Sequence, residues 1–319
     1  MTNRDEVPVD FEHVPVMLQE VLETFETVGE GLLVDATVGG AGHSLALLEQ
    51  QLDRKILGID RDETAVMVAR KRLEKYSNRA KVVHGTFDQI GALVDDCSLP
   101  LAGAIFDLGV SSYQLDTADR GFSHRFDSPL DMRMNAKQDL NADIVVNTYE
   151  EKELRWLLRR NADEKHASRI ATAIVNARPI RTTRELANVV RDSVPAAVRR
   201  LGRHPAMRTF QAIRIEVNNE LSLIEPAIRS VIERLQTGGR IAVLSYHSGE
   251  DRIVKHLLRE AADGLCHCPS ALPCICGAGP TVRLLKRKVR RPAESEIGHN
   301  PRATSARFRA AERLPLGEL

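Results

Sequence analysis

The feature that most constrains this chain is a strand-like run followed at once by a glycine-rich turn and a helix. Residues 32–35 are apolar and end in a carboxylate, residues 39–42 form the turn, and residues 44–50 are helix-like. Glycines let a backbone approach a ligand closely, and the first turn of a helix offers unpaired N–H groups to polar ligand atoms. This stretch therefore predicts a ligand-binding turn in an α/β fold.

The ligand predicted for this turn is a nucleoside without phosphates. The dinucleotide fingerprint G-x-G-x-x-G fails, because its third position falls on Leu45. A second strand-like run, residues 55–59, leads into Asp60, at the distance from the glycines where a carboxylate usually meets ribose hydroxyls. S-adenosylmethionine fits this combination better than NAD does. A strand–helix–strand unit that binds no ligand is the alternative.

Three strand-like runs each end in an aspartate, namely Asp35, Asp60 and Asp107. The carboxyl ends of parallel strands meet at the crevice where open α/β sheets bind their ligands, so we expect these acids along one rim. A further strand-like run, residues 80–84, precedes Phe87. This phenylalanine either borders an adenine or belongs to the core.

The alternation of strands and helices stops after Asp107. Three helix-like segments follow, at residues 150–160, 164–177 and 183–192, and Thr182 and Glu185 form a capping-box pattern before the last of them. The other predicted elements are helices over 18–25, 63–76, 210–235 and 253–262, and strands over 241–245, 281–289 and 303–311. We therefore expect a sheet domain of residues 1–112 and 215–319, interrupted by a helical substrate domain of residues 113–214.

Composition is that of a globular protein without a membrane span. The 319 residues are 43% hydrophobic and 28% charged, and no stretch approaches the roughly 20 apolar residues that cross a bilayer. The first residues also lack the charged-then-apolar pattern of a secretory signal. We expect a cytoplasmic protein that does not bind membranes. The sequence leaves the oligomeric state open, with a homodimer among the alternatives.

Charge is distributed unevenly although its net value is only +1. Residues 1–30 hold eight acids and one base, whereas residues 281–319 hold ten bases and four acids. Such an uneven distribution of charge suits a nucleic-acid binder. A solvated surface would also explain each charged segment considered alone. The candidate RNA-binding residues are Arg199, Arg200, Arg203, Arg208, Lys286, Arg287, Lys288, Arg290 and Arg291. Aromatic residues make up only 4% of the chain, so we expect no stacking platform for single strands.

Four of the five cysteines form two closely spaced pairs, Cys266 with Cys268 and Cys274 with Cys276. Four thiolates can hold a tetrahedral zinc ion, but the spacing of one residue within each pair is tighter than in usual structural sites. A redox-active pair or ordinary reduced thiols are favoured over metal. No metal is therefore predicted.

Several long motifs together resemble the bacterial ribosomal RNA small-subunit methyltransferase H family. They are DATVGGAGH (35–43), GIDRD (58–62), DLGVSSYQLD (107–116), RGFS (120–123), PLDMRM (129–134), RTFQAIRI (208–215), HSGEDRIVK (247–255) and NPRA (300–303). Three positions depart from the family pattern. Ala41 replaces a common glycine and so lacks the freedom to adopt positive φ, Gly249 replaces a usual leucine, and Thr304 replaces a common arginine.

The resemblance implies a class I S-adenosylmethionine-dependent methyltransferase, with a Rossmann-like sheet and an all-helical insertion. It also implies N4-methylation of a cytidine in the decoding region (P site) of 16S rRNA within the small ribosomal subunit. Carried over position by position, the cofactor contacts are Gly39, Gly40, Ala41, Gly42, His43, Asp60, Phe87, Asp107 and Gln114.

Methylation of a cytosine amine needs acceptors that draw its N–H bonds out of conjugation with the ring, together with accurate positioning. Asp107 is predicted as the catalytic acceptor. His247 is the second catalytic candidate, with a hydrogen-bonded structural histidine as the slightly favoured alternative. The functional alternatives are an amino-methyltransferase on another nucleic acid, a non-catalytic S-adenosylmethionine-binding assembly factor, and a dehydrogenase, which the missing third glycine disfavours.

Overall fold

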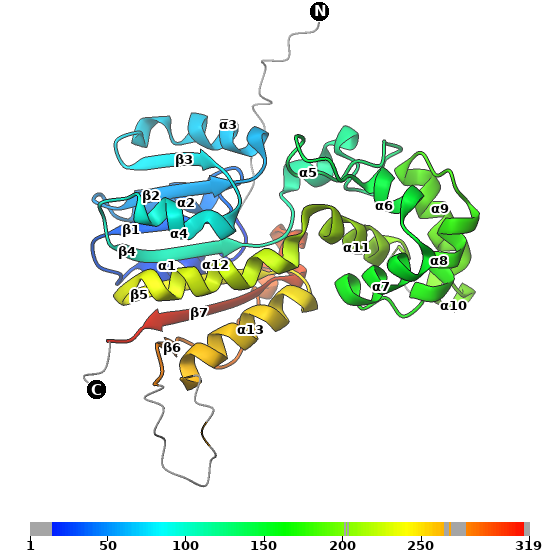
Figure 1. The fold of residues 1–319 in the computed structure, drawn as a ribbon. Helices are drawn as coiled ribbons and strands as arrows, with labels where there is room; N and C mark the ends of the chain where they lie inside the picture. The colour runs from blue at the N-terminus through cyan, green and yellow to red at the C-terminus, as the bar shows by residue number, and fades with distance from the viewer. Residues whose placement is uncertain (1–14, 201, 203, 265–267, 269–278, 316–319) are drawn as a thin grey trace, which may run out of the picture. The chain divides into compact units, whose positions relative to one another are not determined.

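The chain forms two compact units (Figure 1). This computed structural model describes residues 15–200, 202, 204–264, 268 and 279–315. One unit comprises residues 1–109 with 222–319, and the other comprises residues 110–221. The division expected from the sequence had its boundaries at residues 113 and 214, and the role of the inserted part as a substrate domain stays a prediction.

The first unit is built on a seven-stranded sheet in the order β3-β2-β1-β4-β5-β7-β6. Its strands are β1 (Leu32–Asp35), β2 (Lys55–Asp60), β3 (Ala80–His84), β4 (Leu101–Asp107), β5 (Leu235–Ser245), β6 (Val282–Leu284) and β7 (Arg307–Arg313). The first five strands are parallel, and β7 runs antiparallel to both β5 and β6. Every residue of β1 is buried, as expected for a parallel strand covered on both faces. The predicted α/β fold is confirmed.

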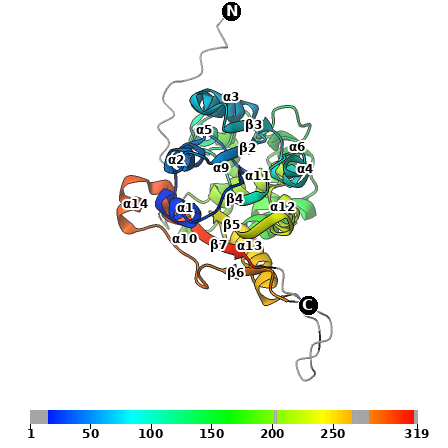
Figure 2. The ribbon, with the colours of Figure 1, turned by 90° about the vertical axis from the view of Figure 1, so that its left-hand side faces the viewer.

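Helices cover both faces of this sheet. They are α1 (Leu18–Phe25), α2 (Gly42–Gln50), α3 (Glu63–Arg72), α4 (Ile90–Asp95), α12 (Glu220–Arg234), α13 (Ser248–Asp263) and α14 (Glu294–His299). Figure 2 shows α1 and α2 on one face, with α4 and α12 on the other. Phe25, Leu33 and Leu47 belong to one buried cluster between sheet and helices. Among the described residues, no helix is long and apolar enough to span a membrane.

The strand order reverses direction between β1 and β4. Ligands of open α/β sheets bind outside the carboxyl ends of the strands at such a reversal. The two strands that flank it end in Asp35 and Asp107, and β2, the neighbour of β1, ends in Asp60. The fold therefore places the three aspartates at the ends of three adjacent parallel strands.

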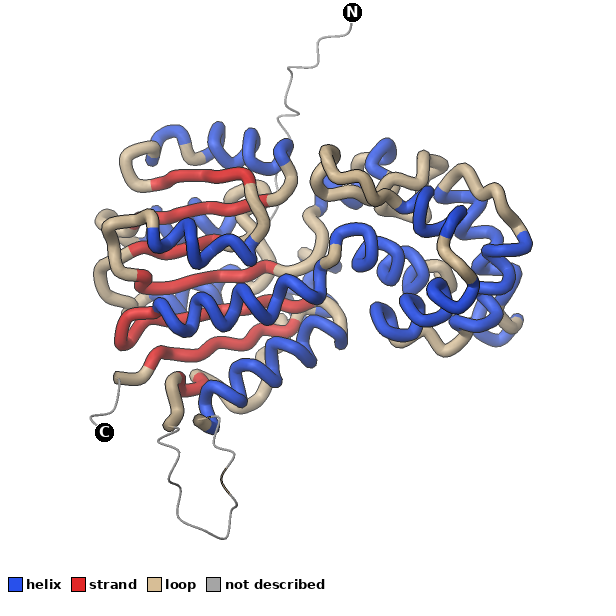
Figure 3. Tube along the Cα trace, viewed as in Figure 1, coloured by secondary structure: helices blue, strands red, loops and turns tan. Residues whose placement is uncertain are grey.

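The second unit is helical, and no strand occurs among the residues described there (Figure 3). Its helices are α5 (Ser112–Asp116), α6 (Ala142–Thr148), α7 (Glu151–Ala162), α8 (Ala167–Asn176), α9 (Thr183–Ser193), α10 (Ala196–Arg199) and α11 (Met207–Asn218). Leu154, Ile170, Leu186 and Ile213 meet in one buried cluster. The predicted capping box at Thr182 opens α9. The expected all-helical insertion is confirmed.

The prediction of one long helix over residues 210–235 is wrong. The structure has two helices, and Asn219 separates them with φ +50°. Its backbone N–H bonds to the last carbonyls of α11, the ending that a left-handed residue gives a helix. Asparagine adopts this conformation more readily than most residues. The break therefore needs no glycine or proline, the two residues that usually mark a helix end in a sequence.

Further boundaries differ from the predictions. The strand expected over 241–245 begins at Leu235, the helix expected over 253–262 begins at Ser248, and the helix expected over 63–76 ends at Arg72. The helix expected from residue 164 begins at Ala167, because Glu164 instead accepts the N–H of His166. The strand expected over 281–289 is only β6, and the strand expected over 303–311 is β7. Residues Pro301–Ser305 form a 3-10 turn before it, opened by the side chain of Asn300.

The left-handed break at Asn219 gives a stability test. Asn219→Ala is expected to lower the free energy of unfolding by about 1 kcal/mol, because alanine resists positive φ, whereas Asn219→Gly should equal or exceed the wild type. Equilibrium urea unfolding followed by the fluorescence of the single tryptophan, which lies in the same unit, measures both. A glycine variant less stable than the alanine variant would contradict the assignment.

Candidate functional site

The carboxylate of Asp35 is buried at the end of β1 and receives two hydrogen bonds. Ser44 Oγ donates to Oδ2 at 2.6 Å, and the backbone N–H of Thr37 donates to Oδ1 at 3.3 Å. Burial raises the pKa of Asp35 to about 6, and the bond from Ser44 opposes that rise. Asp35 therefore ties the start of α2 to the end of β1.

Asp60, the predicted ribose acceptor, is bonded to the glycine turn. The N–H of Gly39 donates to its Oδ2 at 2.9 Å, and the N–H of Asp62 donates to its Oδ1 at 2.8 Å. Burial raises the pKa of Asp60 to about 6, while these two bonds lower it. The carboxylate thus joins the end of β2 to the turn that follows β1.

One residue of the glycine turn, Ala41, has a backbone conformation that differs from the prediction. Ala41 adopts φ +61° at the N-terminus of α2, so the expectation that alanine would not take positive φ here is wrong. Such a conformation costs an alanine roughly 1–2 kcal/mol. Strained residues of this kind cluster at ligand sites. Nearby, the carbonyl of Gly40 accepts a hydrogen bond from Arg72.

Asp107, at the end of β4, is held by side chains from two other segments. Tyr246 donates its hydroxyl to Asp107 Oδ1 at 2.6 Å, and the backbone N–H of Asp107 donates to Thr37 Oγ1 at 2.6 Å. Burial and the adjacent carboxylate raise the pKa of Tyr246, so its hydroxyl remains a proton donor. The carboxylate is about one-fifth exposed. A predicted catalytic group is therefore fixed in orientation and still accessible.

His43 lies between the segment before α1 and Asp107. Its Nε2 lies 3.0 Å from the carbonyl oxygen of Val16, which can only accept, so Nε2 carries the proton. Its Nδ1 then faces Asp107 Oδ2 at 3.8 Å. Burial lowers the pKa of His43, which favours the neutral ring. The His43 side chain thus has an internal partner, and contact of its backbone with the cofactor stays a prediction.

His247, the second catalytic candidate, caps α13. Its Nδ1 accepts the N–H groups of Gly249 at 3.2 Å and Glu250 at 3.4 Å, while Glu250 Oε2 accepts the N–H of Tyr246 at 2.8 Å. These bonds are those of a structural histidine, the alternative that the sequence favoured. Proton handling by His247 stays a prediction.

Two predicted cofactor contacts have other partners in the structure. Phe87 is half-buried after β3 and meets Phe106 edge to face, with ring centroids 6.0 Å apart. Gln114 belongs to the second unit, where its Oε1 accepts the N–H of Ser111 at 3.1 Å in the capping box of α5. Neither contact excludes a ligand, so both roles stay predictions.

The candidate RNA-binding residues are mostly exposed. Exposed members are Arg199, Arg200 and Arg208 in the helical unit, and Lys286, Arg287, Lys288 and Arg291 in the sheet unit. Arg290 differs, because ion pairs with Glu20 at 3.4 Å and Glu23 at 3.1 Å already neutralise its charge. Arg203 lies outside the described residues, as do Cys266, Cys274 and Cys276. Among the residues that are described, no group of three or more potential ligands could hold a metal.

Comparison with known proteins identifies the family. A family model described as the MraW methylase family matches residues 10–314. This chain belongs to the MraW methylase family. The ribosomal RNA small subunit methyltransferase H of Heliobacterium modesticaldum is 44% identical over 95% of this chain and 99% of its own length. The Thermobifida fusca protein of the same name is 47% identical over 94% of this chain and 93% of its own.

The family expected from the motifs is thus confirmed for this methylase. A solved structure of an rRNA methylase from Streptococcus thermophilus is also similar, at 12% identity and a TM-score of 0.41, covering 93% of this chain and 95% of that one.

Sequence reasoning missed three residues that hold the aspartates of the candidate site, namely Thr37, Ser44 and Tyr246. Ser44 and Thr37 each bond to an aspartate at a strand end. Tyr246 directly follows β5, and β5 pairs with β4, so its phenol reaches the aspartate at the end of the neighbouring strand. A sequence signal existed for Tyr246, because it directly follows the predicted strand over 241–245, next to the strand end where the aspartates of the other strands lie.

Removing the Ser44 hydroxyl is expected to destabilise the methylase in a pH-dependent manner. Ser44→Ala should lower the free energy of unfolding by about 1–3 kcal/mol at pH 8, where Asp35 is ionised, and by less at pH 5. The folded pKa of about 6 exceeds the unfolded 3.8, so ionisation of Asp35 lowers stability as the pH rises from about 4 to about 6. Loss of the Ser44 hydroxyl should make the free energy of unfolding decrease more steeply as the pH rises.

Urea unfolding at pH 5 and pH 8 measures the effect, and an Asp35→Asn background serves as the control. In that background the pH dependence of the Ser44→Ala change should disappear. An equal loss at both pH values in the Asp35 protein would show that the hydrogen bond does not stabilise the ionised carboxylate.

Proposed function

We propose that this protein methylates N4 of a cytidine in the decoding region of 16S rRNA, within the small ribosomal subunit, with S-adenosylmethionine as donor. The observation that carries the proposal is the accessible carboxylate of Asp107, held by Tyr246 at the reversal point of the sheet in a family of methylases. The names of the relatives in Heliobacterium modesticaldum and Thermobifida fusca support ribosomal RNA as the substrate.

The residues at the strand ends fit S-adenosylmethionine. Asp60 supplies a carboxylate suited to ribose hydroxyls, and Phe87 supplies a half-buried aromatic surface after the next strand. Residues 39–42 bring backbone close to the same region, and the failed dinucleotide fingerprint disfavours a pyrophosphate-containing ligand. When bound, this donor supplies a methyl group on a positively charged sulfur.

Asp107 is the proposed acceptor for the cytosine amine. The nitrogen lone pair is delocalised into the ring, and a hydrogen bond from N4–H to the carboxylate favours the geometry in which the lone pair can attack. A carboxylate has about four lone-pair sites, so the bond from Tyr246 does not exhaust its capacity. As the new N–C bond forms, the bond from sulfur to the methyl carbon breaks and its electron pair stays on sulfur, which becomes neutral. The amine loses one proton, and Asp107 or solvent accepts it. Positioning of the amine against the methyl group supplies the rest of the rate acceleration, so no strong base is needed.

The first experiment is methyl transfer from labelled S-adenosylmethionine to small subunits from cells that lack this protein, followed by nucleoside analysis. Naked 16S rRNA and DNA serve as parallel substrates. N4-methylcytidine in the subunit RNA supports the proposal. Transfer to DNA alone would indicate an amino-methyltransferase on another nucleic acid. No transfer despite tight donor binding would indicate a non-catalytic assembly factor.

Substitutions of Asp107 and Asp60 are expected to impair different steps, turnover in one case and cofactor binding in the other. Asp107→Ala should abolish turnover, whereas Asp60→Ala should mainly weaken binding of S-adenosylhomocysteine, because only Asp107 is proposed to touch the reacting amine. Calorimetric binding and steady-state kinetics separate the two effects. Equal loss of affinity in both variants, with turnover otherwise intact, would refute this division.

Tyr246→Phe is the matched variant for the orientation of Asp107. It removes one hydroxyl and leaves the ring, so kcat should fall about tenfold or more, as expected for a hydrogen bond to a charged group. The affinity for S-adenosylhomocysteine should remain within about twofold, since Tyr246 is not proposed to touch the donor; an unchanged kcat would remove Tyr246 from the proposal.

Binding of S-adenosylhomocysteine is expected to weaken in acid. Asp60 has a pKa of about 6 in the free protein, and an ionised carboxylate accepts ribose hydroxyls better than a protonated one. Affinity should therefore be constant from pH 8 to pH 7 and fall below pH 6, approaching about tenfold per pH unit. Titration calorimetry from pH 5 to pH 8 measures this dependence.

Two variants identify the group responsible. Asp60→Asn should bind more weakly at neutral pH and lose the acid dependence. Asp35→Asn should retain it, although the pKa of Asp35 is also about 6, because Asp35 is buried against Ser44. A wild-type profile that stays flat down to pH 5 would rule out Asp60 as the ribose acceptor.

A further inference from the structure

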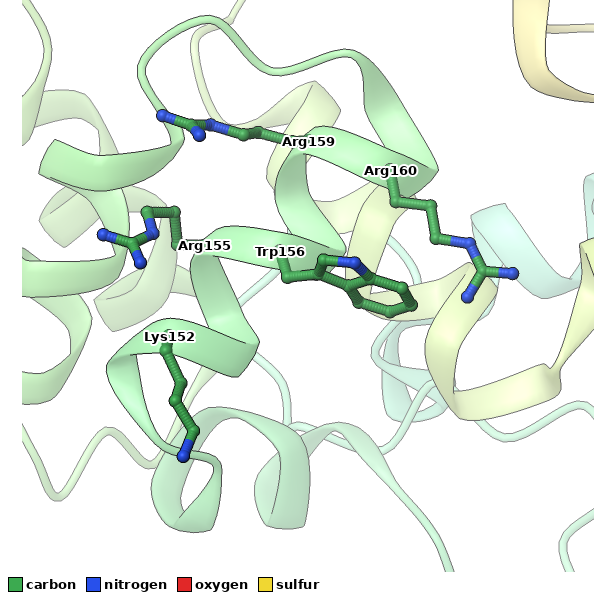
Figure 4. A pocket seen from close by; sticks show the side chains of 5 residues that line it. All are labelled: Lys152, Arg155, Trp156, Arg159 and Arg160. Carbon is green, nitrogen blue, oxygen red and sulfur yellow. The ribbon is translucent and has the colours of Figure 1, made fainter.

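One face of α7 in the helical unit carries a cluster of cations around an exposed indole. Lys152, Arg155, Trp156, Arg159 and Arg160 are all exposed and line an open hollow of about 460 Å³ (Figure 4). Their spacing places them along one stripe of the helix, whereas the intervening leucines at 154, 157 and 158 are buried in the core of the unit. We call this stripe the α7 face.

Most of the positive charge of the α7 face is not neutralised within the described part of the chain. Lys152 pairs with Glu150 at 2.8 Å, and Arg159 donates to the hydroxyl of Ser168 at 3.1 Å. No ion pair joins Arg155 or Arg160 to an acid of the described residues. The three arginines therefore present guanidinium groups to solvent.

The indole on this face is unusual in its exposure. Trp156 is the single tryptophan of the chain, and 53% of its surface is accessible. The guanidinium of Arg160 lies 4.5 Å from the centre of its ring, a cation–π contact that holds the indole in place without covering it entirely. A rigid aromatic surface thus lies among guanidinium groups that suit phosphates.

From this arrangement we infer that the α7 face binds RNA, with its arginines on backbone phosphates and Trp156 stacked on one unpaired base. Proteins recognise RNA at unpaired bases, which stack on aromatic side chains and guanidinium planes. An acidic protein surface would satisfy the charges and leave the indole without a matched partner. The inference rests on the proposed function, because it assigns part of the binding of the RNA substrate to this face.

The low aromatic content predicts no stacking platform for single strands, and one exposed indole on the α7 face is not such a platform. It offers one base-sized surface rather than a row of them. We therefore expect binding to one unpaired nucleotide within a structured RNA, with the flanking phosphates adding a strongly salt-dependent component.

Because Trp156 is the single tryptophan, its fluorescence reports on the α7 face in the intact chain. The full-length protein is titrated with a single-stranded oligoribonucleotide, an abasic oligomer of the same length, and polyglutamate. The oligoribonucleotide should quench the fluorescence, and the abasic oligomer and polyglutamate should quench it much less. Equal quenching by the abasic oligomer would overturn base stacking, and equal quenching by polyglutamate would indicate an acidic partner instead. No quenching by RNA would overturn the proposal.

Variants test the same face by a second route. Trp156→Ala and the pair Arg155→Gln with Arg160→Gln should each weaken binding of a labelled oligoribonucleotide about tenfold and raise KM for small subunits to a similar extent. Met67→Ala and Arg259→Gln, at exposed positions on α3 and α13, are the matched controls and should change neither value.

The affinity for S-adenosylhomocysteine separates this inference from the proposed function. It should be unchanged in the α7 variants, and an unaltered far-ultraviolet circular dichroism spectrum establishes that their helical unit folds. Unaltered RNA binding and KM in those variants would overturn the role of the α7 face while methylation by the wild type stands. Failure of methyl transfer by the wild type would overturn the proposed function, and the fluorescence titration would still decide whether the α7 face binds RNA.

Discussion

The strand-end site depends on keeping buried and half-buried carboxylates supplied with hydrogen bonds. Removing an ionised carboxylate from water is costly unless fixed donors replace the lost solvent. Asp35 and Asp60 both receive such donors from residues 37–44 or the adjoining loop, and burial still raises both pKa values to about 6. The glycine turn is thus held in shape by the acids on either side of it, and its positive-φ alanine belongs to the same arrangement.

Asp107 depends on a different part of the chain. Its hydroxyl donor, Tyr246, lies 139 residues further along, beyond the entire helical unit. The two residues meet because β4 and β5 are neighbours in the sheet. The helical unit can therefore be inserted between these strands without separating the groups proposed to act on the amine. The chain gains a second surface, including the α7 face, while the sheet keeps its own geometry.

Local signals were enough to predict β1, β2, β4, the glycine turn and the aspartates at these strand ends, because apolar runs that end in a carboxylate need no tertiary information. The contact from Tyr246 to Asp107 could not be predicted in this way, since it depends on which strands pair. The break at Asn219 and the positive φ of Ala41 were missed for another reason, namely that neither residue is a glycine. The α7 face was missed because composition counts aromatic residues without showing which of them remain exposed.

The insertion between β4 and β5 also affects how the protein is made. At a synthesis rate of about 5–20 residues per second, the ribosome needs roughly 6–25 s to produce residues 108–234 after β4 has emerged. During that time the apolar edge of β4 that later pairs with β5 has no partner, and unpaired apolar edges are prone to aggregation. The helical unit, whose contacts are mostly its own, can fold in that interval. The sheet unit therefore cannot complete its sheet until β5, β6 and β7 have been made.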